Sequence, residues 1–211
     1  MFFYHNIKRT LLLSLIAFSI SFSYAQEHHH RTDLKNQRII QSSIFLVSYN
    51  EVYEQPNWMR YHVRDIEKKF DRKGMRFYTV DSVHTSDDHD YYKNPWDKGH
   101  IAPAAAFTDS HENLYATFSY LNCTLQKDRL NQGAWAALER EVRALAQVYG
   151  PIEVEVVVDF KPGHQILETG AHIPSGFWKT LCYSNGIERC FYFPNEDPTN
   201  DWEGYEVFCV N

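Results

Sequence analysis

Residues 131–160 read NQGAWAALEREVRALAQVYGPIEVEVVVDF, and this stretch decides the fold class. Its first part predicts a helix that begins at or near Asn131, with Gly150-Pro151 as a typical stop. Its second part predicts a half-buried strand, because apolar residues occupy every second position from Ile152 to Phe160. The apolar face of the helix consists of Trp135, Leu138, Val142 and Leu145.

The sequence shows strand patterns both before and after this predicted helix. Ile44, Leu46 and Ser48 alternate, residues 54–57 interrupt the pattern, and residues 58–63 resume it, which indicates two antiparallel strands. Two more strands are expected around the turn residues Asn185-Gly186. Residues 64–92 lack apolar periodicity and predict an irregular loop. The sequence therefore predicts an α+β fold with a mostly antiparallel β-sheet and one principal helix.

The first 25 residues have the layout of a secretory signal peptide. Lys8 and Arg9 precede an apolar run over residues 11–22, which is too short to span a bilayer, and small residues end the segment at Ala25. We therefore expect residues 1–25 to be a signal peptide, residues 26–36 a flexible leader and residues 37–211 the folded domain. The protein is then secreted or periplasmic, with no membrane attachment after cleavage.

The four cysteines all follow the expected cleavage site. In an exported protein this even number favours disulfide bonds over metal binding. One arrangement joins Cys182 with Cys190 across the Asn185-Gly186 turn and leaves Cys123 for Cys209. A two-residue turn would however place Arg189 opposite Cys182, so the three possible pairings stay open.

Three polar residues suggest a site for phosphodiester hydrolysis. That reaction needs a base for water, a cation for the charge growing on the phosphate, and help for the leaving oxygen. His100, in Asp97-Lys98-Gly99-His100, supplies an imidazole that titrates near neutral pH. Asn131 supplies a neutral oxygen at the positive end of the predicted helix, where phosphate is also favoured.

Glu139 is the third of these residues, eight positions after Asn131. In an ideal helix the two residues are separated by about 80° around the axis and about 12 Å along it. This distance is too long for both side chains to bind one ion directly. We therefore expect a magnesium ion, which retains most of its waters, on Asn131, with Glu139 holding one of those waters.

Three segments together resemble a known family. The strings DKGHIAPAAAF, YLNCTLQKDRLNQGAWAALE and HIPSGFWK begin at residues 97, 120 and 172. In order and spacing they resemble the non-specific DNA/RNA endonuclease family that includes endonuclease G, whose members are ββα-metal (His-Me finger) nucleases. The resemblance implies a ββα-metal motif, His100 as general base, Asn131 as sole protein ligand of hydrated Mg²⁺ (or Mn²⁺), and Glu139 on a metal-bound water.

The same resemblance assigns three supporting residues. Asn122 corresponds to an asparagine that buttresses the site, and Arg76 to an arginine that contacts the phosphate. Lys98 stands where the family usually has arginine, which keeps the charge but loses the planar bidentate grip on phosphate. The implied activity is cleavage of both DNA and RNA with weak sequence preference, leaving 5′-phosphate ends.

The charge of the chain bears on this interpretation. The formal charge is −6, and removal of Lys8 and Arg9 with the signal lowers it by two further units. Such a protein needs a local basic cluster to bind nucleic acid. The expected cluster consists of Arg76, Lys98, Lys127 and Arg129.

Two alternative functions remain. One is a non-catalytic exported binding protein with the same fold, which the acidic charge and Lys98 favour. The other is a metal-dependent phosphodiesterase for smaller substrates. The oligomeric state is left open by the sequence.

Overall fold

The computed structural model describes residues 36–209, so the expected signal peptide and almost all of the expected leader lie outside the described residues. Within residues 36–209, the helices and strands all belong to one compact unit, which ends at Phe208. Within residues 36–209, no helix combines the length and apolar character needed to cross a bilayer.

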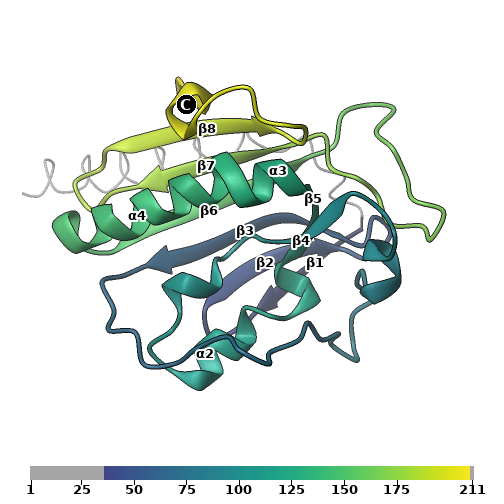
Figure 1. The fold of residues 1–211 in the computed structure, drawn as a ribbon, viewed down its shortest axis with the longest axis horizontal. Coiled ribbons are helices and arrows are strands. Elements are labelled where there is room, and N and C mark those ends of the chain that lie inside the picture. Colours follow the sequence, from purple (N-terminus) through teal and green to yellow (C-terminus); the bar gives the residue numbers. More distant parts are fainter. Residues whose placement is uncertain (1–35, 210–211) are drawn as a thin grey trace, which may run out of the picture. The chain divides into compact units, whose positions relative to one another are not determined.

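The main sheet has seven strands in the order β1-β2-β3-β6-β7-β8-β9, and every neighbouring pair is antiparallel (Figure 1). A separate antiparallel pair is formed by β4 (Trp96–His100) and β5 (Cys123–Lys127). The strands of the main sheet are β1 (Gln37–Gln41), β2 (Phe45–Asn50), β3 (Gln55–Val63), β6 (Ile152–Asp159), β7 (Gly176–Cys182), β8 (Glu188–Pro194) and β9 (Glu206–Val207).

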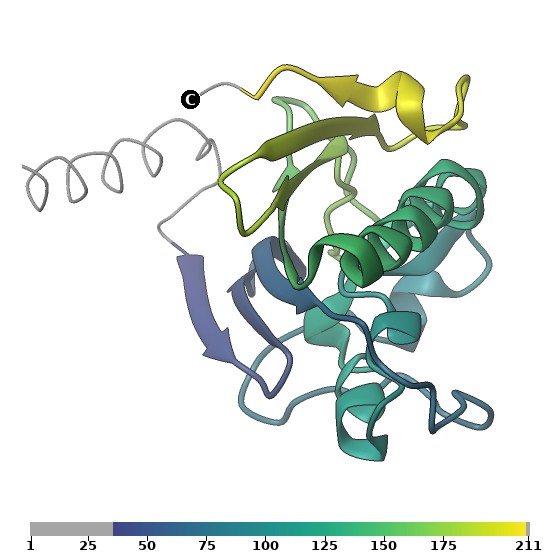
Figure 2. The same cartoon turned by 90° about the vertical axis from the view of Figure 1, so that its left-hand side faces the viewer.

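The principal helix lies against one face of the main sheet, where it contacts β6 and β3 (Figures 1 and 2). It begins as α3 (Asp128–Leu130), passes through a wide π-helical turn, η5 (Asn131–Trp135), and continues as α4 (Ala136–Tyr149). It therefore starts three residues before Asn131 and ends where predicted, at Gly150, whose φ of 81° favours glycine. The apolar face of α4 buries Leu138, Val142 and Ala146.

Short helices complete the unit. They are α2 (His111–Ala116) and the 3-10 turns η2 (Asp88–Tyr91), η3 (Ala104–Ala106), η4 (Tyr120–Asn122) and η6 (Trp202–Tyr205). The predicted α+β class with a mostly antiparallel sheet is confirmed.

Some predicted details of the sheet are wrong. In β2 the core face carries Phe45, Val47 and Tyr49, and not the alternating set that begins at Ile44. The interruption falls at residues 51–54, and Gln55-Pro56-Asn57 is already part of β3. Strand β1 was not predicted because most of its side chains are exposed and lack an apolar period.

Of the cysteine pairings that the sequence left open, the arrangement that joins Cys182 with Cys190 does not occur. Cys190 and Cys209 are disulfide-bonded, whereas Cys123 and Cys182 are free thiols. The loop between β7 and β8 is longer than a two-residue turn, so Cys182 lies opposite Glu188, and Cys190 lies opposite Thr180. The Sγ atom of Cys182 donates a weak hydrogen bond to Glu188 at 3.8 Å.

Candidate active site

The β4–β5 pair and the helix that follows it form the framework of the site. Antiparallel pairing places His100, the last residue of β4, opposite Cys123, the first residue of β5. The chain leaves β5 at Lys127, enters the helix at Asp128 and reaches Asn131 after one turn. This strand-strand-helix order is the one that the ββα-metal resemblance implies.

His100 and Asn131 line the same pocket, which has a volume of about 540 Å³. Segments far apart in the sequence supply its wall: the loop after β3, strand β4, the segment before η4, and the start of the helix. The lining residues are Asp71, Arg72, Lys73, Met75, Phe77, Asp97, Lys98, His100, Phe118 and Asn131.

The imidazole of His100 lies against aromatic rings. Its centroid is 4.9 Å from that of Phe77 and 5.1 Å from that of Phe118. Burial, with a smaller contribution from the positive charge of Arg72, lowers the pKa of His100 from 6.5 to about 4. The Nε2 atom is buried and has no hydrogen-bond partner among the described residues. The ring is therefore neutral at physiological pH and has an unused polar atom.

Gly99 lets β4 pack closely on β5. A Cβ atom at this position would lie 2.4 Å from Oε1 and 2.6 Å from Cβ of Gln126. Any larger residue would push the two strands apart. Glycine therefore fixes the distance between the strand that carries His100 and the strand that leads to Asn131.

Asn122 is completely buried, and all its hydrogen bonds are to backbone groups. Its Oδ1 accepts from the N–H of Ala102 at 2.7 Å, and its Nδ2 donates to the carbonyls of Ala102 (2.9 Å) and Thr117 (2.8 Å). These bonds join the chain after His100 to the chain before β5. Asn122 is thus a positioning residue, which agrees with a buttressing role and not with contact to a substrate.

Asp97 fixes the orientation of the Asn131 amide. The Nδ2 atom of Asn131 donates to Oδ2 of Asp97 at 2.9 Å, and Gln132 donates to the same oxygen at 2.8 Å. With its nitrogen engaged, the amide keeps Oδ1 as an available acceptor, for which no donor is found among residues 36–209. No role was assigned to Asp97 from the sequence, because only the β4–helix contact reveals it.

The wide turn η5 changes the geometry between Asn131 and Glu139. Gly133 has non-helical backbone angles there, with φ −100° and ψ −111°. A π-type turn accommodates roughly one extra residue. The eight positions from Asn131 to Glu139 therefore rotate around the helix axis about as far as seven positions of a regular α-helix. Seven residues rotate about 700°, which is only about 20° short of two full turns. The wide turn therefore reduces the angular separation of about 80° expected for an ideal helix.

Glu139, the third residue of the expected site, is half-buried on α4. Burial raises the pKa of its carboxyl, and the positive charges of Lys179 and Arg143 oppose that shift. Lys179, on β7, is 1% exposed, and its Nζ lies 3.9 Å from the centroid of the Trp135 ring. Arg143 also donates to the backbone carbonyl of Glu139 at 3.1 Å. Glu139 does not line the His100 pocket and belongs instead to a charged cluster beside it.

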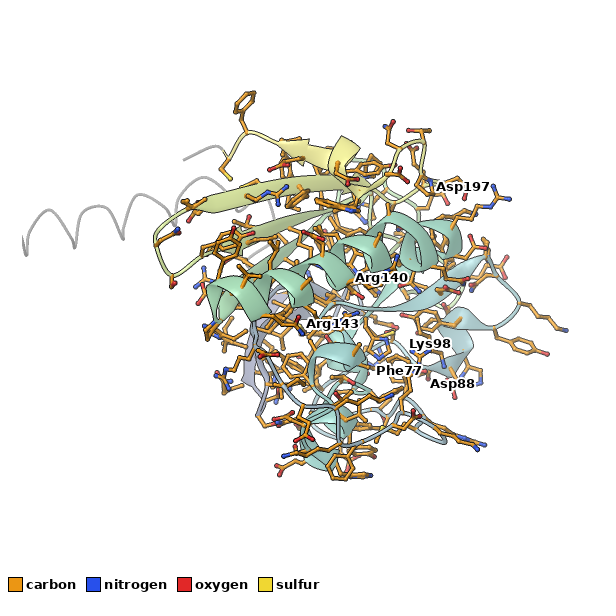
Figure 3. The ribbon with its side chains drawn as sticks, turned by 60° about the vertical axis from the view of Figure 1, so that its left-hand side comes forward. Phe77, Asp88, Lys98, Arg140, Arg143 and Asp197 are labelled. Carbon is orange, nitrogen blue, oxygen red and sulfur yellow. The ribbon has the colours of Figure 1, made fainter. Side chains whose placement is uncertain are left out.

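Lys98 lines the pocket but is engaged with other side chains. Its ammonium group forms an ion pair with Asp88 and lies 5.4–5.6 Å from the ring centroids of Phe77, Tyr91 and Tyr120. Figure 3 shows Phe77, Lys98 and Asp88 grouped together, away from Arg140 on α4.

The other members of the expected basic cluster do not reach this pocket. Arg76 is exposed and outside the lining, because Met75 and Phe77 on either side of it point inward and extended chain alternates. Lys127 lies 3.7 Å from both Asp128 and Asp197, and Arg129 is exposed.

Arg72 and Lys73 supply the positive charge instead. A second pocket of about 470 Å³ shares Asp71 and Arg72 with the first and adds Arg64, Lys68 and Arg143. In the second pocket the cations outnumber the carboxylates, whereas in the first they do so only when Lys98, which is paired with Asp88, is counted. No sequence pattern indicates this set, since residues 64–73 form a charged loop without periodicity.

Fold and site together define an α+β protein in which a ββα framework presents an imidazole and an amide oxygen to one basic pocket. The comparison with protein families identifies the class more closely. The chain belongs to the DNA/RNA non-specific endonuclease family, whose model matches residues 26–211.

Curated relatives and a solved structure agree with this assignment. The chain is similar to a nuclease of Serratia marcescens (38% identical over 99 residues, 42% of this chain and 35% of the relative). It is also similar to mitochondrial nuclease EXOG of Danio rerio (28% over 130 residues, 59% and 37%) and mitochondrial endonuclease G of Homo sapiens (36% over 87 residues, 40% and 29%). The matches thus span only about a third of each relative.

The structural comparison supports the fold. A chain of the crystal structure of the EndoG/EndoGI complex superposes with a TM-score of 0.70, covers 80% of this chain and 79% of its own length, and is 21% identical. At this identity the likeness is one of fold.

Proposed function

We propose that this chain is an exported endonuclease that hydrolyses phosphodiester bonds of DNA and RNA, with His100 as general base and Asn131 as ligand of a hydrated Mg²⁺ or Mn²⁺ ion. The observation that carries the proposal is that His100 and Asn131, from separate elements, line one basic pocket. Family membership supports the reaction class. The roles of individual residues rest on the pocket geometry.

His100 is in the unprotonated state that a general base requires. Because its pKa is lowered to about 4, the imidazole is unprotonated at neutral pH and able to accept a proton from water. Its aromatic neighbours hold the ring in one orientation, and its Nε2 has no hydrogen-bond partner among the described residues. A buried polar atom without a partner costs free energy, which a functional role explains.

The residues present also fit a hard divalent cation. Asn131 offers a neutral oxygen that Asp97 leaves free, and oxygen ligands suit Mg²⁺. Within residues 36–209, no three His, Cys, Asp or Glu side chains cluster so as to hold a metal ion, so a cation here would depend on Asn131 and water. When bound, it would neutralise charge developing on the phosphate and the leaving oxygen.

The chain's own groups then have distinct tasks. His100 takes a proton from the water that attacks phosphorus in line, which leaves the phosphate on the 5′ end. Arg72 and Lys73 attract the substrate phosphates, and Asp97 keeps the Asn131 amide oriented. Because these contacts address the backbone and not base edges, cleavage of DNA and RNA with weak sequence preference follows.

Export is part of the same proposal. The N-terminal pattern of residues 1–25 and the disulfide-bonded Cys190 and Cys209 support an oxidising compartment, either the periplasm or the exterior.

The direct test is digestion of supercoiled plasmid and of RNA by purified residues 26–211. We expect both to be cleaved with Mg²⁺ and neither with excess chelator. His100→Ala should lower the rate about 100-fold or more, since proton transfer contributes that much. Asn131→Ala should also lower the rate, because it removes the proposed metal ligand. Activity that survives the chelator, or that persists in His100→Ala, refutes the proposed chemistry.

Two matched variants control for the loss of a side chain as such. His62→Ala removes an exposed histidine on β3, and Asn200→Ala removes an exposed loop asparagine. Both should cleave at the wild-type rate.

A further inference from the structure

We propose that Lys98 and Tyr120 form a cradle for one phosphate oxygen of the substrate, and that Asp88 fills this cradle in the free protein. The carboxylate of Asp88 thus competes with the nucleic-acid backbone. This inference rests on the proposed function; to the phosphate contact that the family resemblance implies for Lys98, it adds Tyr120 as a second donor and Asp88 as an internal competitor.

The first observation is that two donors converge on one anionic oxygen. The Lys98 ammonium pairs with Oδ1 of Asp88, and the Tyr120 hydroxyl donates to the same Oδ1 at 2.6 Å. The lowered pKa of the Asp88 carboxyl, caused first by Lys98 and then by Tyr120, agrees with an ionised group there. A phosphodiester presents an oxygen of similar charge and hydrogen-bonding capacity, so the donors that hold Oδ1 are equally able to hold it.

The second observation is that the cradle lies beside the proposed base. The Phe77 ring contacts the His100 ring at a centroid distance of 4.9 Å, and the Lys98 ammonium lies 5.5 Å from the same Phe77 centroid. Lys98 and His100 both line the pocket that contains Asn131. A phosphate oxygen bound by Lys98 and Tyr120 would therefore belong to a nucleotide at or next to the scissile bond.

The third observation is that the donors are fixed and the carboxylate is exposed. The Lys98 side chain is only 29% exposed and is surrounded by three aromatic rings, and Tyr120 is 2% exposed. The Asp88 side chain is 80% exposed and belongs to the short turn η2 (Figure 3). An ion pair with an exposed partner is weak and screened by salt. A substrate phosphate that displaces the Asp88 carboxylate therefore leaves Lys98 and Tyr120 in place.

The test measures binding separately from cleavage. Fluorescence anisotropy of a labelled 12-nucleotide single-stranded DNA, in excess chelator, gives Kd for full-length variants at low salt and at 200 mM salt. Asp88→Asn should bind about two- to fivefold more tightly than wild type at low salt, which is the range for an exposed ion pair. The gain should shrink at 200 mM salt.

A charge-matched control and a double-mutant cycle identify the cause. Asp81→Asn removes an exposed carboxylate from the neighbouring turn and should leave Kd near the wild-type value. In a Lys98→Met background, Asp88→Asn should give no gain, and Tyr120→Phe should reduce the gain seen with Lys98 present. Thermal unfolding of each variant verifies that it is folded.

The outcomes separate this inference from the proposed function. If wild type cleaves but Asp88→Asn binds no more tightly than Asp81→Asn, the inference is wrong and the nuclease assignment stands. If Asp88→Asn tightens binding equally in the Lys98→Met background, Asp88 acts by general charge repulsion of the nucleic acid. That result also overturns the inference. A wild-type chain that neither cleaves nor binds nucleic acid refutes both.

Discussion

At the scale of single residues, the environment of His100 has a consequence for stability. Burial lowers its pKa from 6.5 to about 4, so between these values the unfolded chain binds a proton that the folded chain does not. The free energy of unfolding should therefore fall as pH decreases through this window, by roughly 3 kcal/mol in total from this group.

Urea unfolding at pH 7, 5.5 and 4.5 checks this prediction. The decrease should be smaller in His100→Gln than in wild type, because the variant has no group to protonate. His62→Gln serves as the control for an exposed histidine and should follow the wild-type pH dependence. Parallel pH profiles for wild type and His100→Gln would contradict the buried, neutral imidazole.

Glu139 and the buried Lys179 lead to a second prediction at this scale. Burial raises the pKa of Glu139 and lowers that of Lys179, and the charge of each opposes the shift of the other. Lys179→Met should lower the free energy of unfolding at pH 7, because it removes the positive charge that favours the ionised Glu139 carboxylate.

The double variant Glu139→Gln with Lys179→Met removes both charges and should recover much of that loss in denaturant unfolding. If the double variant is less stable than Lys179→Met alone, the two side chains do not act as a pair. Lys161→Met, on an exposed lysine, controls for the loss of a surface cation and should change stability little.

At the scale of elements, Asn195 anchors strand β5. Its Oδ1 accepts from the N–H of Lys127 at 2.8 Å, and its Nδ2 donates to the carbonyls of Leu125 and Pro174, each at 2.9 Å. Gln55 on β3 accepts from the N–H of Leu125 at 3.1 Å. These side chains satisfy backbone groups of β5 on the edge not paired with β4.

Asn195→Ala should therefore destabilise the unit by about 2 kcal/mol or more, since it leaves backbone groups of β5 unpaired. It should also lower nuclease activity, because β5 positions β4 and His100. Urea unfolding and the plasmid assay measure the two effects. Asn200→Ala, whose amide makes one 3.3 Å bond to Thr199, is the matched control. Equal stability of the two variants would rule out the anchoring role.

At the scale of the whole molecule, binding of a divalent cation should stabilise the fold. A ligand that binds only the folded state raises the free energy of unfolding by about 1.4 kcal/mol at ten times its Kd. Increasing Mg²⁺ should therefore raise Tm of wild type but not of Asn131→Ala. If Tm of both rises equally with Mg²⁺, the cation binds elsewhere.

At the same scale, the acidity of the chain is compatible with the proposed binding of nucleic acid. The net charge is −6, yet the cations of the pockets outnumber their carboxylates. The electric field close to the surface depends mainly on the nearest charges. A local excess of positive charge is therefore sufficient to attract phosphate. The residues that provide it come from a loop and a helix that are distant in sequence.

The sequence by itself determined the α+β class, the helix that ends at Gly150, the alternating strand β6 and the residues His100 and Asn131. These features depend on periodicity, stop residues and local motifs, which are properties of neighbouring positions. Only the tertiary structure decided that Arg72 and not Arg76 lines the pocket, that Glu139 is influenced by the charge of the buried Lys179, that Cys182 is a free thiol, and that Asp88 pairs with Lys98. Each of these depends on contacts between segments far apart in the chain, and side-chain burial and charge pairing are set by such contacts and not by local pattern.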